Sequence, residues 1–308
     1  MPRMNPRVFV AVAVVFCAIR GLPAATFSVA TFNLENYLDV SVEHRTAKPD
    51  QARAKIRESI RALNADVLAL QEMGSTNALL ELRSSLRAEG LDYPHWELVS
   101  GFDTNIHVAV LSRFPFIAQR PHTNEAFLLN RRRFSVSRGF AELDIRINDT
   151  YRITLIALHL KSRREVPEAS EADLREQEAI QVRKVVDARL DSDPNVNLIV
   201  LGDFNDLKDS KPVKTLIGRG RTALVDTRPA ERNGDDPTSA NSRTAPRNVT
   251  WTYHFGKDDT YSRIDYILIS RGLAQEWNPQ ATYVLSVPNW GQASDHRPIL
   301  ASFVADDK

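Results

Sequence analysis

The pattern of apolar and polar positions predicts a chain of many short strands with a few helices between them. Residues 26–33 combine apolar and β-branched side chains as a half-buried strand does, and residues 67–70 form the short apolar run of a buried strand. Asp50 can cap a helix between these two strands. Apolar residues then repeat at helical spacing, at Ala54, Ile56, Ile60 and Leu63.

The same two periodicities predict the remaining elements. Helices are expected at residues 75–89 and 169–190, and residues 228–248 have the composition of a long polar loop. Further strands are expected at residues 96–100, 106–111, 116–118, 141–147, 153–160, 197–201, 250–253, 264–269, 281–285 and 298–304. This order favours an α+β fold in which two packed β-sheets are flanked by helices.

The first 25 residues have the pattern of a secretory signal peptide. Arg3 and Arg7 precede an apolar run at residues 8–19, and small residues follow up to Ala25. The alternative is an uncleaved membrane anchor, but a spanning helix needs about 20 apolar residues. We therefore expect residues 1–25 to be a cleaved signal, residues 26–308 to form one exported domain, secreted or periplasmic, and no membrane span to remain after cleavage.

Composition places the mature chain among ordinary globular proteins, since 43% of the 308 residues are hydrophobic and 26% are charged. The only cysteine, Cys17, lies in the leader, so no thiol is left to form a disulfide or bind a metal. Three of the 40 basic residues also lie there, which leaves 37 against 39 acidic residues and a formal net charge of −2. An anionic substrate must therefore be recognised locally, and we expect a monomer.

Polar residues gather where the predicted strands end. Asn33, Glu72 and His159 each close a strand, and Asp203 and Asn205 follow another. Carboxylates, an amide and imidazoles without a thiol are suited to bind a hard divalent cation. Enzymes commonly use such cations in reactions of phosphate esters.

These residues belong to six motifs: Thr31-Phe32-Asn33, Leu70-Gln71-Glu72, Leu158-His159-Leu160-Lys161-Ser162, Gly202-Asp203-Phe204-Asn205, Arg263-Ile264-Asp265-Tyr266 and Ser294-Asp295-His296-Arg297-Pro298. In this order they resemble the endonuclease/exonuclease/phosphatase superfamily, which includes deoxyribonucleases, abasic-site endonucleases and neutral sphingomyelinases. One such motif carries little information, but six in order are specific. The resemblance covers residues 30–299 and implies a four-layer α/β sandwich of two mostly antiparallel sheets and a metal-dependent phosphodiesterase.

The resemblance also implies roles for metal ligands. Glu72 would be the principal ligand, with Asn33 beside it. Asp295 would complete the shell, and Glu35 matches a second acid of some family members. Mg²⁺ is the expected cofactor, with Mn²⁺ or another divalent cation as the alternative.

For catalysis, the resemblance implies that His296 activates water while Asp265 fixes its tautomer. Asn205 would donate to a phosphate oxygen and Asp203 would move a proton, and which of Asp203 and His296 is the base stays open. His159 would donate to the phosphate. It should have a carboxylate partner, but the sequence offers no acid at the corresponding place except Asp103.

Each of these residues, taken alone, also has a purely structural explanation. Asp203 and Asn205 could form an Asx turn, and His159 could be a core residue. Asp265 could pair with Arg263, and Ser294-Asp295 could start a turn. Their occurrence as an ordered set favours a function in catalysis or binding.

Among the basic residues, Arg138 and Lys161 are candidates for contacts with substrate phosphate. The run Arg131–Arg133 reads as a solvated loop or, less readily, as a binding patch.

Three functions fit these observations. The first is an exported nuclease that hydrolyses DNA or RNA by metal-assisted in-line attack of water, since residues 32–37 are similar to the opening of secreted bacterial nucleases of the superfamily. The second is a phospholipid or sugar-phosphate phosphodiesterase with the same catalytic design. The third is a binding protein that has the same fold but no catalytic activity. This alternative is disfavoured because all the main catalytic positions of the family motifs are present.

Overall fold

The computed structural model describes residues 25–42, 44–231 and 250–305. Apart from Ala25, the predicted signal lies outside the described residues, as does most of the polar loop predicted at 228–248. Within the described ranges, no helix is both long enough and apolar enough to cross a membrane.

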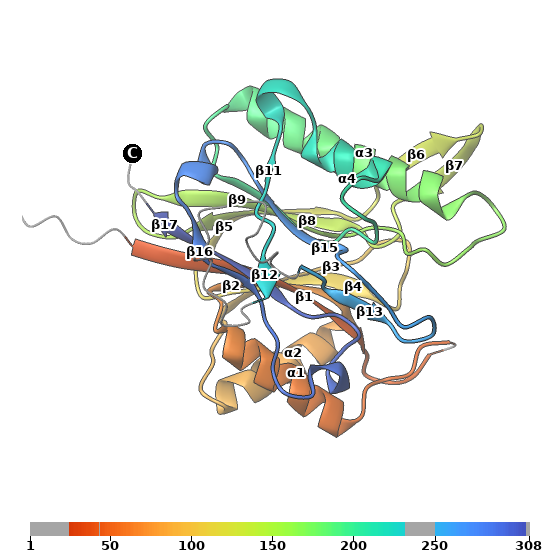
Figure 1. Cartoon of the computed structure of the whole chain (residues 1–308), viewed down its shortest axis with the longest axis vertical. Coiled ribbons are helices and arrows are strands. Elements are labelled where there is room, and N and C mark those ends of the chain that lie inside the picture. The colour runs from red at the N-terminus through yellow and green to blue at the C-terminus, as the bar shows by residue number, and fades with distance from the viewer. Residues whose placement is uncertain (1–24, 43, 232–249, 306–308) are drawn as a thin grey trace, which may run out of the picture.

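Two β-sheets pack face to face, and helices cover both outer faces (Figure 1). Helices α1 (Asp50–Leu63) and α2 (Thr76–Ala88) cover one sheet, and α3 (Glu171–Ser192) and α4 (Lys211–Ile217) cover the other. Most neighbouring strands run antiparallel, as the register of each pair shows. The four-layer sandwich expected from the sequence is therefore confirmed.

One sheet has seven strands in the order β12 (Ala230–Glu231), β16 (Trp277–Val284), β17 (Ile299–Ala305), β1 (Ala25–Tyr37), β2 (Val67–Met73), β4 (His107–Ser112) and β3 (His95–Val99). The other has six, in the order β11 (Val225–Asp226), β15 (Asp265–Ile269), β10 (Leu198–Asp203), β9 (Arg152–His159), β8 (Phe140–Arg146) and β5 (Phe116–His122). Two hairpins stand outside them, β6 (Ala126–Leu129) with β7 (Arg132–Ser135) and β13 (Tyr253–Phe255) with β14 (Thr260–Ser262). Short 3₁₀ turns are η1 (Gly220–Thr222), η2 (Leu273–Gln275) and η3 (Trp290–Gln292).

Alternation along the strands builds three apolar layers. Leu155 of β9 points into the core between the sheets, whereas its neighbour Ile156 packs toward α3 and α4. On the other sheet, Val67 faces the same central core and Leu68 faces α1 and α2. Burying both faces of each sheet fixes the register, because a slip of one residue would exchange the two faces.

The structure corrects several expected boundaries. Helix α1 begins at Asp50 itself, so Pro49 and not Asp50 occupies the capping position. Residues 131–133, expected as a loop or binding patch, form part of the turn and the start of the second strand of a hairpin, in which Phe127 and Phe134 stack 6.0 Å apart. The strand expected at 250–253 starts only at Tyr253. Helix α4 was not expected.

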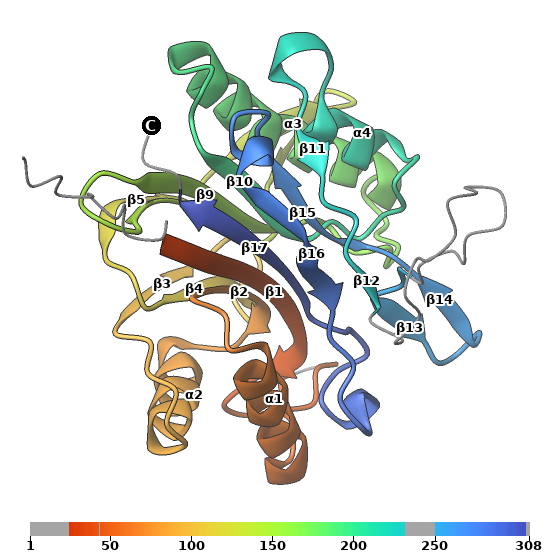
Figure 2. The same cartoon turned by 60° about the vertical axis from the view of Figure 1, so that its left-hand side comes forward.

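The strand pairing brings the polar clusters to one end of the sandwich. Strands β1 and β2 run parallel, and so do β9 and β10, so each pair ends at the same edge of its sheet. Strand β15 runs antiparallel to β10 and begins where β10 ends. Figure 2 shows β1 running toward the end of the molecule at which the β13–β14 hairpin lies.

Candidate active site

Asp203 lies at the centre of the polar cluster. In the six-stranded sheet it is directly opposite His159 on one side and Asp265 on the other. Its Oδ2 atom accepts a hydrogen bond from Asn33 Nδ2 at 3.0 Å and lies 3.4 Å from His159 Nε2 and 3.8 Å from His296 Nε2. Sheet packing therefore brings Asn33 and Asp203 into contact although they are 170 positions apart in the sequence.

Local backbone geometry holds Asp203 in place. Gly202 has a φ of +142°, and a Cβ there would lie 1.9 Å from the Leu158 carbonyl oxygen, so only glycine allows this approach of β9 and β10. Asp203 Oδ1 accepts a 2.8 Å hydrogen bond from the Asn205 N–H, and Asn205 has a φ of 54°. Its Nδ2 donates to the Leu160 carbonyl at 3.0 Å. Asp203 and Asn205 therefore form the Asx turn and also belong to the predicted site, so the two interpretations do not exclude each other.

The acids predicted as metal ligands lie on the other sheet, beside Asp203. Glu72 has a φ of 58°, a region that non-glycine residues rarely adopt, which is typical of functional positions. Its Oε1 lies 3.5 Å from Asn33 Nδ2, and its Oε2 accepts from the backbone N–H of Asn36 at 3.0 Å. Glu35 is half-exposed and pairs with Lys48 at 2.8 Å.

The electrostatics of this acid group fit a divalent cation. Burial raises the pKa of Asp295 to about 6, and the negative charges of Glu35 and Glu72 raise it against the opposing effect of His296. These three carboxylates, together with the amide of Asn33, make an oxygen-rich donor set of the kind that Mg²⁺ or Mn²⁺ prefers.

Among the described residues, the group with the close spacing of a metal site is a different one, Asp203, Asp265 and His296, whose ligand atoms all lie within 4.8 Å of one another. In this group, however, His296 Nδ1 is already bonded to Asp265 Oδ2 at 2.9 Å. Arg263, the alternative partner of Asp265, pairs instead with Asp226 at 2.7 Å. This trio is therefore better suited to moving protons than to holding the cation.

The two histidines have opposite electrostatic environments. Burial by itself lowers the pKa of His296, but Asp265 and Asp203 raise it well above its usual value, so the ring is positively charged near neutral pH. Burial lowers the pKa of His159 well below its usual value, and the positive charges of Arg138 and His296 lower it further. Burial also raises the pKa of Asp203, to about 7.

The carboxylate partner expected behind His159 is not among the described residues. His159 Nδ1 is buried without a hydrogen-bond partner, and the acid beside the ring is Asp203, on the Nε2 side. Asp103, which the sequence offered, pairs with Arg45 at 2.8 Å instead.

Positioning residues also emerge that the motifs did not single out. The Ser294 hydroxyl donates to the Asn33 carbonyl at 2.7 Å and accepts from the His296 N–H at 3.0 Å. Thr252 Oγ1 accepts from the Asp265 N–H at 3.2 Å. The motif and the turn expected at Ser294 gave its side chain no role, and its bond to Asn33 on the neighbouring strand β1 depends on tertiary packing.

The two basic residues expected to contact substrate lie next to this cluster. Arg138 is 5% exposed and donates from Nη1 to the Leu160 carbonyl at 2.8 Å, the same oxygen that accepts from Asn205. Lys161 Nζ donates to the carbonyls of Ser162 and Arg164. Both side chains line a cavity of about 680 Å³ beside the catalytic cluster.

Comparisons with known proteins agree with this geometry. The model of the Endonuclease/Exonuclease/phosphatase family matches residues 30–296. A comparison with curated proteins finds no match to the sequence.

Among solved structures, the human nocturnin catalytic domain is similar at 16% identity, with a TM-score of 0.62 over 91% of this chain and 95% of that one. Truncated TDP2 from Caenorhabditis elegans (16% identity, TM-score 0.57, 91% and 98%) is also similar. So is sphingomyelinase C from Streptomyces griseocarneus (18% identity, TM-score 0.52, 91% and 99%). At these identities the likeness concerns the fold. Because the family model spans most of the sequence, the chain belongs to the endonuclease/exonuclease/phosphatase family.

Proposed function

We propose that the protein is a divalent-metal-dependent phosphodiesterase whose substrate is DNA or RNA. The observation that carries the proposal is the convergence of Asn33, His159 and His296 on one oxygen of Asp203, beside the acid group of Glu72. Enzymes of this family are typically metal-dependent hydrolases of phosphate esters. The arginine and lysine side chains beside the cluster supply the local positive charge that a mildly acidic chain needs to bind a nucleic acid.

In this proposal Glu72, Asn33, Asp295 and Glu35 hold a single Mg²⁺ or Mn²⁺ ion. When bound, the cation would polarise a phosphoryl oxygen and stabilise the charge that develops there. Asn33 also fixes the orientation of Asp203 through its amide. One hydrogen bond therefore joins the residues that would hold the cation to the residues that would transfer protons.

The remaining residues handle protons and charge. Asp203, with its pKa near 7, is the group able to accept a proton from the attacking water at neutral pH. His296 is kept positive by Asp265 and donates from Nε2 to a phosphoryl oxygen. His159 stays neutral and, with Asn205, supplies further donors to the phosphate. This division makes Asp203 rather than His296 the base.

A phospholipid is the alternative substrate of the same chemistry. Phe255 and Tyr261, on the hairpin next to His296, are 39% and 54% exposed and could contact a lipid surface. A binding protein without turnover is the alternative of another class.

A substrate panel separates these functions. Purified protein is incubated with plasmid DNA, RNA, sphingomyelin vesicles and bis-p-nitrophenyl phosphate, each with Mg²⁺, Mn²⁺ or EDTA. We expect metal-dependent cleavage of nucleic acid, loss of that cleavage in His296→Ala, and retention in the matched control His95→Ala on the outer strand β3. Cleavage of sphingomyelin alone would contradict the nuclease proposal, and no cleavage of any substrate would contradict the enzyme proposal.

We also propose that residues 1–25 direct export and are removed, so that residues 26–308 form the catalytic domain. N-terminal sequencing of the protein recovered from outside the cytoplasm tests this. A sequence that begins within a few residues of Thr26 is expected, and a chain that keeps Met1 would contradict it.

A further inference from the structure

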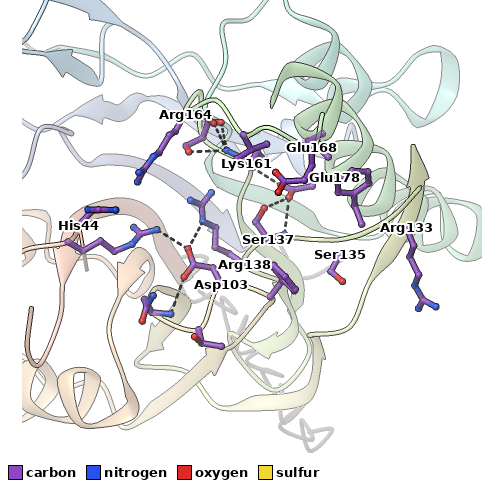
Figure 3. A pocket seen from close by; sticks show the side chains of 18 of the residues that line it. His44, Asp103, Arg133, Ser135, Ser137, Arg138, Lys161, Arg164, Glu168 and Glu178 are labelled. Atoms are coloured by element: carbon purple, nitrogen blue, oxygen red, sulfur yellow. Dashed lines mark hydrogen bonds and ion pairs between the residues drawn. The ribbon is translucent and has the colours of Figure 1, made fainter. Parts of the chain in front are cut away.

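The cavity beside the catalytic cluster, which we call the cationic cavity, lies between the loop of residues 101–105, strand β7 and the segment 161–168. Figure 3 shows its side chains, with Arg138 near Asp103 and Lys161 above them, whereas Arg133 points away from the other labelled residues. Six of the residues that line it are arginine or lysine and three are acidic. The cavity therefore has an excess of positive charge.

Among the described residues that line this cavity, Arg138 is a buried cation with one unsatisfied nitrogen. It is 5% exposed, and its Nε is buried without a hydrogen-bond partner. The nearest acid, Asp103, lies 4.0 Å from Nε and already accepts from Arg45 at 2.8 Å and from the Asn105 N–H at 3.0 Å. A buried guanidinium whose nitrogen has no acceptor costs free energy, and an anion that entered the cavity would supply the acceptor.

Lys161 adds a second cation without a carboxylate partner of its own. In the described chain its Nζ donates to the backbone carbonyls of Ser162 and Arg164 and, at 3.5 Å, to the Ser162 hydroxyl, but to no carboxylate. The nearby carboxylate of Glu178 accepts instead from the Lys161 backbone N–H at 2.6 Å and from the Ser137 hydroxyl at 2.6 Å. Burial lowers the pKa of Lys161, and repulsion by Arg138 lowers it further. An anion between the two side chains would relieve this repulsion.

One backbone group links the cationic cavity to the catalytic cluster. The Leu160 carbonyl accepts from Asn205 on the catalytic side and from Arg138 on the cavity side. A substrate whose reacting phosphate contacts Asn205 would therefore continue toward Arg138.

We propose that the cationic cavity binds a second phosphate of the substrate, next to the one that is hydrolysed, so that the protein prefers strands or phosphorylated dinucleotides over a lone phosphodiester. The proposal rests on the proposed nuclease function. Phe134 and Val166 give the cavity an apolar wall against which a sugar or base can lie. A phosphate with several oxygens can accept from Arg138 and Lys161 at once, which none of the three acids that line the cavity does in the described chain.

The test compares dinucleotides that differ only in a terminal phosphate. Dinucleotides without a terminal phosphate, with a 5′-phosphate and with a 3′-phosphate are hydrolysed under identical metal conditions. For the wild type we expect kcat/KM to be about 10- to 100-fold higher with one of the phosphorylated forms, because one charged hydrogen bond contributes about that much. Arg138→Met should reduce this preference to within about threefold, mainly through KM.

Two further variants guard against misinterpretation. Lys161→Met removes an ammonium that bonds within residues 162–164 and to no carboxylate of the described chain, and it should lose part of the preference even where Arg138→Met folds poorly. Arg152→Met, at the exposed opposite end of β9, should keep it. A wild type without preference, or variants that slow all three dinucleotides equally, would overturn the proposal.

Binding without turnover separates this proposal from the proposed function. Calorimetry in EDTA measures the affinity of the wild type and of Arg138→Met for the same dinucleotides. Tighter binding of a phosphorylated form that is lost in the variant supports the cavity even where no hydrolysis occurs. Equal binding of all forms would overturn it even where hydrolysis does occur.

Discussion

The regions around the two buried histidines of the site differ in what lies behind each ring. His159 and His296 face the same Asp203 oxygen through Nε2, at 3.4 and 3.8 Å. Asp265 lies behind His296, 2.9 Å from Nδ1, whereas His159 Nδ1 has no partner in the described chain. Accordingly, the pKa of His296 lies well above its usual value and that of His159 well below.

Burial lowers the pKa of both rings, and for His296 the charges of Asp265 and Asp203 outweigh it, whereas His159 has nearby positive charges instead. Asp203 is left between one charged and one neutral donor. The charged ring can stabilise a phosphoryl oxygen, and the neutral one can donate without drawing the proton of Asp203 toward itself. Changes to the two regions should therefore have unequal effects.

The largest effect is expected when the shared carboxylate is removed. Asp203→Asn should lower kcat by about 10³- to 10⁴-fold, because the proton acceptor is lost. The pKa of Asp203 is raised from 3.8 to about 7 on folding, so its ionisation costs stability that grows with pH between these values. The variant should therefore melt at a higher temperature than the wild type at pH 8 in EDTA. Undiminished turnover would contradict the role of Asp203.

A somewhat smaller effect is expected when the group behind His296 is changed. Asp265→Asn should lower kcat about 10²- to 10³-fold, because His296 loses the charge that holds its proton. The pKa of His296, followed by NMR through its imidazole signals, should fall relative to the wild type. An unchanged His296 pKa would show that Asp265 does not set its charge.

The pH dependence of the wild type gives a third test. A base must be deprotonated to accept a proton, and the pKa of Asp203 is about 7 in the protein without metal. Below that pH, kcat/KM should rise about tenfold per pH unit and then level off, with a bound cation moving the inflection to lower pH. A rate that falls as the pH rises from 5 to 7 would rule out Asp203 as the base.

The smallest effect is expected at His159, whose Nδ1 has no hydrogen-bond partner in the described chain. His159→Gln keeps a donor near Asp203 and should lower kcat about tenfold, whereas His296→Gln removes a positive charge and should cost about 10²-fold more. Equal losses in this matched pair would indicate that both rings carry the same charge.

The sequence predicts the strands and their polar ends better than the contacts between them. Alternation suffices to predict β8, and the short apolar runs suffice for β9 and β10, because these strands are buried on both faces. The pairing of Asn33 with Asp203 instead depends on how the two sheets pack. The motifs assigned both residues to one site only through their resemblance to a family.

Other features escaped prediction for local reasons. The β6–β7 hairpin carries consecutive arginines that mask its alternation, and the Phe127–Phe134 contact that holds it forms only once the chain folds back. Helix α4 has seven residues, too few for an apolar period to be recognised. The unpartnered Nδ1 of His159 is visible only when the surrounding residues are in place.

The most direct test is a titration of phosphodiester hydrolysis with Mg²⁺ or Mn²⁺ after treatment with EDTA, for the wild type and Glu72→Gln. Glu58→Gln, an exposed carboxylate on α1 that pairs with Lys55, is the matched control. We predict no hydrolysis without added metal, a metal requirement at least tenfold higher in Glu72→Gln, and no change in the control. Hydrolysis that persists in EDTA, or a metal requirement that is the same with and without Glu72, would contradict a cation held at this site.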